Sequence, residues 1–315
     1  MQKNIFHNIN SFAYLLISIS IALIFTGVII QISVSSRTIL DPVDDVVLVN
    51  EDDSTVHIDK PISTTVSKDE EKNNKHKNQK NILEINNLET LNKNILEEIE
   101  TKYGIVVLFG EDTIGYSVGG IDTVPLDSNE SIYEALSKIK KCLNNYPSDL
   151  FLEIKNGGIP LTIVLIKNYV DMNVTGVTDS SYSYAKISLA TIHPLEESFY
   201  HETYHYIERF LLKKGANFNN WNSLNPVGFR YGQIYSSNSY SNSFLENAPF
   251  VNNYAQTMDT EDRASTFEYM MAEEKANCFN KGQIIWRKAL NIARTMEYVL
   301  DSVKPTVTEY WERFL

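Results

Sequence analysis

Cysteine is scarce in this chain: only Cys142 and Cys278 occur among 315 residues, and they are not in C-x-x-C spacing. This scarcity argues against a disulfide-rich scaffold and against a zinc site built from cysteines. We expect both thiols to lie in the core, with a single bridge between them as the alternative. Basic side chains are also outnumbered, 28 Lys and Arg against 40 Asp and Glu, which gives a net charge of −12 and a pI near 5.0. Such a chain suits work at a cell surface or outside the cell better than binding to a nucleic acid.

Histidine is scarce as well, yet two of the six histidines fall in one short segment, His201-Glu202-Thr203-Tyr204-His205. At this composition, an acidic residue between two histidines in that spacing is expected by chance about 0.014 times. On a helix, imidazoles four residues apart lie on one face and can bind one cation, with the glutamate beside them. The pattern is typical of zinc peptidases. The alternative is a pair of surface histidines on an ordinary helix.

Charged side chains are absent from residues 12–34, an apolar run long enough to cross a bilayer. A cleaved signal peptide is the alternative, although its apolar region would be shorter, about 7–15 residues. Lys3 precedes the run and Arg37 follows it, and this small bias favours a C-terminal domain outside the cell. We therefore predict a transmembrane anchor at 1–36, a disordered charged stalk at 37–81 and a folded catalytic domain at 82–315.

The folded part is predicted to be α+β, because both helical and strand-like apolar patterns occur in it. Ile95, Ile99 and Tyr103 recur at helical spacing, and Gly104 ends that helix. The motif helix is predicted to begin at Pro194 and to end by Gly215. The other predicted elements are strands over 105–109, 161–166 and 184–190, helices over 131–145, 260–280 and 283–303, and a long functional loop over 216–259.

A catalytic zinc takes three protein ligands, so the two motif histidines need a third from elsewhere. Glu208 lies on their helical face, but about 4.5 Å further along the axis, and is better suited to a supporting role. His193 precedes the helix and is expected to be a surface or capping residue. Glu261, which opens the next predicted helix, is the preferred ligand, and Glu268 on the same helix is its rival.

The segment Glu261-x-x-Ala264-x-x-Phe267 resembles the glutamate helix of zincin peptidases of the anthrax lethal factor and clostridial Pro-Pro endopeptidase type. Those peptidases place a tyrosine at the position that Tyr254 has here, ahead of the glutamate. The resemblance implies a zincin-like fold, with a small N-terminal sheet and a helical C-terminal part. It also implies Zn²⁺ held by His201, His205 and Glu261, with Tyr254 as a donor to the reacting oxygen or the leaving group. The other candidates for that tyrosine in the same loop are Tyr231, Tyr235 and Tyr240.

Together these features predict a membrane-anchored zinc endopeptidase with Glu202 as general base and Tyr254 as a second catalytic residue. Its partner is expected to be a protein or peptide substrate, paired in extended form with the edge of strand 184–190. Asp262 and Arg263 are expected to form a surface ion pair, with contacts behind the metal ligands as the alternative. The alternative function is a surface domain without turnover that holds a peptide or a cell-wall partner.

Overall fold

The computed structural model describes residues 87–232, 249–303 and 314, so the predicted membrane span and stalk lie outside the described residues. Among the described helices, none is both long enough and apolar enough to cross a bilayer. The described part is a mixed α+β fold, as predicted. Its elements in chain order are a helix over 87–103, β1 (Val106–Leu108), η1 (Gly110–Thr113), β2 (Ser117–Val118), β3 (Ile121–Pro125), α3 (Asn129–Leu143), α4 (Leu150–Asn156), β4 (Leu161–Tyr169), β5 (Gly176–Ser180), β6 (Ala185–Ala190), α5 (Leu195–Lys213), η2 (Trp221–Leu224), η3 (Tyr254–Gln256), α6 (Asp259–Met271), η4 (Ala276–Cys278) and α7 (Ile284–Val299).

The sheet is built around β4, which pairs in parallel with β1 and β6 and antiparallel with β3. The strand order is β2-β3-β4-β6-β5, and β5 runs antiparallel to β6. The prediction that strand 184–190 presents a free edge is therefore wrong, because β6 has a partner on each side. The edge belongs to β5, which was not predicted because Gly-Val-Thr-Asp-Ser has little of the apolar alternation that is typical of a strand.

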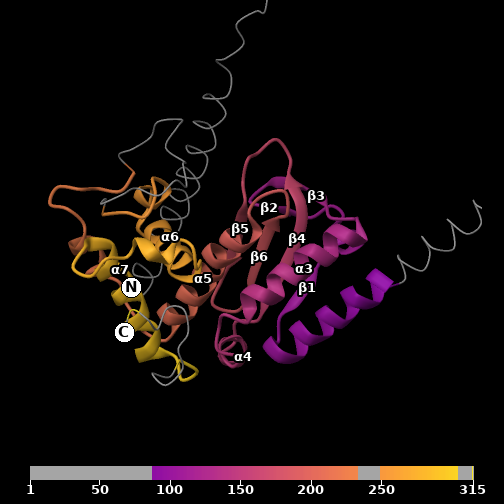
Figure 1. Cartoon of the computed structure of the whole chain (residues 1–315), viewed down its shortest axis with the longest axis horizontal. Coiled ribbons are helices and arrows are strands. Elements are labelled where there is room, and N and C mark those ends of the chain that lie inside the picture. The colour runs from indigo at the N-terminus through magenta and orange to yellow at the C-terminus, as the bar shows by residue number, and fades with distance from the viewer. Residues whose placement is uncertain (1–86, 233–248, 304–313, 315) are drawn as a thin grey trace, which may run out of the picture. The chain divides into compact units, whose positions relative to one another are not determined.

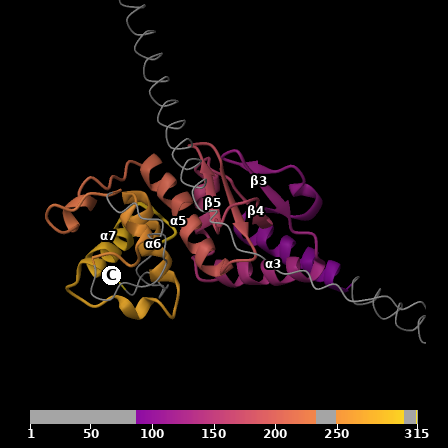
Figure 2. The same cartoon turned by 90° about the horizontal axis from the view of Figure 1, so that it is seen from above.

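Helices, α3 and α5 among them, cover one face of the sheet. Helices α6 and α7, which follow the sheet in the chain, lie on the far side of α5 (Figures 1 and 2). Alternate residues of β4 point to opposite faces: Ile163 and Leu165 enter the main core, whereas Val164 and Ile166 enter a smaller cluster. In both views α5 lies between the sheet and the pair α6 and α7. The helix with the histidine motif is thus packed on both sides.

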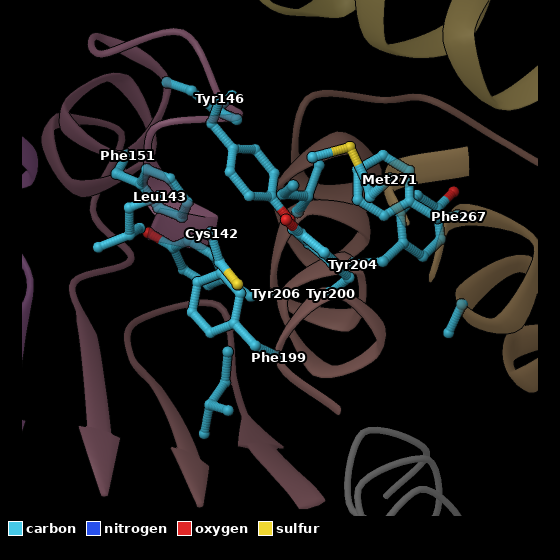
Figure 3. Packing of buried hydrophobic residues seen from close by; sticks show 14 of the residues in the cluster. Cys142, Leu143, Tyr146, Phe151, Phe199, Tyr200, Tyr204, Tyr206, Phe267 and Met271 are labelled. Carbon is cyan, nitrogen blue, oxygen red and sulfur yellow. The ribbon is translucent and has the colours of Figure 1, made fainter. Parts of the chain in front are cut away.

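Aromatic side chains fill the space between α5 and its neighbours (Figure 3). The ring centroid of Tyr146 lies 5.1 Å from that of Phe151 and 6.3 Å from that of Phe267. Tyr204 of α5 packs on Phe267 of α6 at 4.9 Å. Such ring pairs contribute about 0.5–1.5 kcal/mol each beyond the area they bury. The aromatic-rich composition predicted a substantial core, and this prediction is confirmed.

Several element boundaries differ from the predicted ones. The helix predicted over 260–280 ends at Met271, because Ala272 adopts an extended backbone (φ −77, ψ 115). The helix predicted over 283–303 ends at Val299, where Leu300 is extended in the same way. Pro194 is the N-cap of α5 and not its first residue. The elements β2, β3 and α4 were not predicted, because each has too few residues to show a clear apolar period.

Candidate metal centre

The two motif histidines lie side by side on α5, as helical spacing requires. Their ring centroids are 5.1 Å apart. Glu196 and Glu197 in the first turn complement the positive end of the helix dipole, and Lys213 stands in the last turn. His201 is buried and His205 is partly exposed, so the pair lies where the packed helix meets solvent.

Helix α6 crosses α5 and brings Glu261 to the two histidines. The Oε2 atom of Glu261 lies 3.0 Å from Nε2 of His201 and 3.5 Å from Nε2 of His205. Among the described residues, these three form a group whose ligand atoms all lie within 4.8 Å of one another. Zinc holds nitrogen and oxygen ligands at about 2.0–2.2 Å in a tetrahedron, which places ligand atoms about 3.3 Å apart. The donor types and their spacing therefore fit a zinc ion.

Glu268 lies behind His201 and not across the candidate site from it. Its Oε2 is 3.5 Å from Nδ1 of His201, the ring nitrogen opposite to the one that faces Glu261. Nζ of Lys275 forms salt bridges at 2.8 Å with both Glu268 and Glu197, so the Glu268 carboxylate has a second partner besides His201. A carboxylate on the second nitrogen of a ligating histidine typically fixes the tautomer and the ring orientation. The geometry thus gives Glu268 a different place from the ligand position for which it was considered.

His201 and Glu261 shift each other's pKa values. Burial alone would lower the pKa of His201, yet its hydrogen bonds to Glu261 and Glu268 outweigh burial and raise the pKa to about 10. Burial would raise the pKa of Glu261, but the hydrogen bonds and the charges of the two histidines hold it well below 4.5. A buried cluster in which carboxylates stabilise a protonated histidine would also stabilise a metal cation in place of that proton.

Tyr254 lies beside the histidines, at the start of the short helix η3 that precedes α6. Its ring centroid is 5.8 Å from that of His201. The rival Tyr231 lies elsewhere: its hydroxyl group donates to Asp262 Oδ2 at 2.6 Å and accepts from Trp221 and Asn225. The other two candidate tyrosines lie outside the described residues. Among the described ones, Tyr254 is the tyrosine placed next to the candidate ligands.

The two residues after Glu261 form buried ion pairs, so the prediction of a surface ion pair between them is wrong. Asp262 Oδ2 pairs with Nζ of Lys288 at 2.6 Å, and both side chains are fully buried. Arg263 pairs with the buried Glu208 of α5 and with Asp259. These pairs tie α6 to α7 and to α5. Among the described residues, neither Glu208, which pairs with Arg263, nor His193 belongs to the group of potential metal ligands.

Glu202 faces away from solvent, towards β5, and is only 7% exposed. Thr178 Oγ1 of β5 lies 2.6 Å from Glu202 Oε2, and Gly176 of the same strand lies against the Glu202 side chain. Sequence reasoning missed both β5 residues, as well as Lys275 and Lys288. Only the alternation of strand residues could have pointed to Gly176 and Thr178, and that required β5 to be recognised first.

No protein-family model matches the chain, and no curated protein matches its sequence. Among solved structures, the chain is similar to a candidate zinc-binding metallo-peptidase from Bacteroides caccae, with 17% sequence identity and a TM-score of 0.49. The match covers 72% of this chain and 90% of that one. Similarity at this level carries no residue role over to this chain, and the resemblance to the lethal factor type stays a prediction.

Proposed function

We propose that this protein is a zinc-dependent endopeptidase of the zincin type. The observation that carries the proposal is the convergence of His201, His205 and Glu261 from two crossing helices. Glu202 lies between the two histidines in the sequence. Two histidines and one glutamate are a ligand set that leaves a coordination position free for catalysis. A structural zinc site would more typically have four protein ligands.

A zinc ion held there would lower the pKa of a coordinated water and polarise the carbonyl of the scissile bond. Glu202 then takes the proton from the attacking water and passes it to the leaving amine. Tyr254, beside His201, supplies a hydroxyl donor to the oxygen on which negative charge develops. A donor of this kind contributes about 2.7–4 kcal/mol to transition-state stabilisation.

The free edge of β5 is our candidate for the substrate-binding strand. Among the described strands, β5 pairs only with β6, and its other edge is left for an extended peptide. Its Thr178 contacts the proposed general base, so a peptide added to this edge would run past the catalytic groups. Main-chain pairing of this kind places a peptide without requiring a particular sequence.

Attachment to a membrane through residues 12–34, with the catalytic domain outside the cell, completes the proposal. It rests on the uncharged apolar run and on the few flanking charges. A protein or peptide near that surface would be the substrate.

Zinc stoichiometry of the purified protein is the first test. We expect one zinc per chain in the wild type, and much weaker binding in Glu261→Ala. The matched control is Glu268→Ala on the same helix, which removes a carboxylate behind His201 and should weaken binding by only about 10–100-fold. A wild-type protein without zinc would overturn the proposal, and full retention by Glu261→Ala would remove Glu261 from the ligand set.

Turnover is the second test, measured by mass spectrometry on a peptide library. Glu202→Gln should retain zinc, because the residue is not a ligand, and should lose activity by at least about 10²-fold. A Glu202→Gln protein that cleaves at a rate close to wild type would exclude Glu202 as the general base.

A further inference from the structure

Glu202 is held by the edge strand of the sheet. The Thr178 hydroxyl lies 2.6 Å from Glu202 Oε2 and 3.1 Å from the Glu202 backbone oxygen. Among the described residues, it is the only side chain that hydrogen-bonds this carboxylate. Thr178 therefore contacts both the carboxylate and the backbone carbonyl of Glu202 from a different element.

Gly176 makes this contact possible. A Cβ atom at this position would lie 2.7 Å from Glu202 Cγ, which is closer than real Cβ contacts come, and 3.0 Å from Glu202 Oε1, which is tighter than most of them. Strand residues two apart point to the same side, so Gly176 and Thr178 both face α5. The missing side chain of one lets the strand approach the helix closely enough for the hydroxyl of the other to reach the carboxylate.

The contact restricts how the carboxylate can turn. Glutamate has three rotatable bonds, and fixing such a side chain during the reaction costs conformational free energy. With Oε2 held by Thr178, the other oxygen has a defined direction before substrate arrives. A base that is already oriented avoids that cost in the transition state.

We propose that Thr178 is a positioning residue for Glu202 and that Gly176 is the close-approach residue that allows it. The inference rests on the proposed function, because it assigns a role towards Glu202 as general base. It also means that one strand has two tasks: its free edge is the candidate for substrate pairing, and its inward side chain orients the base.

The test uses the full chain with three variants. Thr178→Val removes the hydroxyl at nearly constant shape, Thr178→Ser keeps it, and Thr123→Val makes the same change on β3, where the Thr123 hydroxyl donates to the Tyr116 backbone oxygen at 2.7 Å. On a peptide selected from the library by the wild type, we expect Thr178→Val to lower kcat about tenfold, with KM and zinc content changed less than about twofold. Thr178→Ser and Thr123→Val should stay within about twofold of wild type.

A second readout does not depend on activity. In a double-mutant cycle on the metal-free protein, Thr178→Val and Glu202→Ala are combined, and unfolding in urea is followed. We expect the combined variant to be less destabilised than the product of the single effects, by a factor of about ten in the unfolding equilibrium constant. The same cycle with Thr123→Val in place of Thr178→Val should show no coupling.

The two proposals fail in different ways. A wild-type protein that binds no zinc overturns the proposed function, and this inference falls with it. A zinc-loaded and active wild type whose Thr178→Val variant has the kcat of Thr123→Val overturns this inference alone. Additive effects in the urea cycle also overturn it, because they would show that Thr178 does not act through Glu202.

Discussion

At the scale of single residues, His201 is the most strongly coupled group of the candidate site. Its Nε2 faces Glu261 and its Nδ1 faces Glu268, so in the metal-free protein a proton on this ring is stabilised by two carboxylates. The pKa of about 10 lies above the ordinary value of 6.5. The protonated ring therefore stabilises the fold fully below about pH 6.5, and this contribution is lost as the pH rises towards 10.

We accordingly expect the free energy of unfolding of the metal-free protein to fall between about pH 6.5 and pH 10. Urea unfolding at several pH values checks this, with Glu261→Gln as the control in which the fall should be smaller. Since zinc replaces the proton, zinc binding at neutral pH should release protons. A stability that is flat over this range would contradict the assigned coupling.

On the acid side, the lowered pKa values of Glu261 and Glu268 mean that these carboxylates stabilise the fold above about pH 4.5, and that this stabilisation is lost below it.

A second residue-scale prediction concerns Cys142, which is a buried free thiol. Burial raises its pKa to about 12, so the reactive thiolate is rare in the folded protein. We expect iodoacetamide at pH 8.5 to modify Cys142 only after unfolding, as measured by mass spectrometry. The partly exposed Cys278 is the internal control, and rapid labelling of Cys142 in the folded protein would contradict its burial.

At the scale of elements, α5 and α6 are joined by a buried ion pair close to the candidate metal ligands. Arg263 and Glu208 are 4% and 6% exposed, and the guanidinium also lies 4.7 Å from the Phe218 ring. Removing one partner of such a pair leaves a buried charge without its counter-charge and typically costs about 3–5 kcal/mol. We expect Arg263→Met to destabilise the fold by this amount in urea unfolding.

The companion variant separates pairing from packing. When Glu208→Met is combined with Arg263→Met, both charges are gone, and we expect most of the lost stability to return. If the two substitutions instead add, the pair does not act as a unit and the crossing of α5 and α6 depends on apolar packing alone.

At the scale of the whole molecule, the prediction of membrane attachment rests on the uncharged apolar run over residues 12–34, which lies outside the described residues. We expect the full chain to sediment with membranes and to need detergent for release, and a variant without residues 1–36 to stay in the supernatant. Protease added to intact cells should degrade the domain if it lies outside. Release of the full chain by salt alone would contradict a membrane span.

The sequence by itself determined the local features of the fold. The apolar period around the motif and the charges at its ends predicted α5 nearly to the residue, and this prediction is confirmed. The strand over 161–166 and the helix over 131–145 are confirmed with shifts of a few residues. Such signals are readable because helix and strand periods involve neighbours in the chain.

The tertiary structure decided what depends on distant contacts. The sequence left Glu261 and Glu268 as rivals, and only the crossing of α6 over α5 placed one on each side of the His201 ring. The crossing also buried the charges after Glu261, where local reasoning expects solvent. Strand β5 could not be predicted, because Gly176 and Thr178 contact Glu202 closely and the strand lacks apolar alternation. Contacts between residues far apart in the chain depend on packing, and packing has no local period from which it can be predicted.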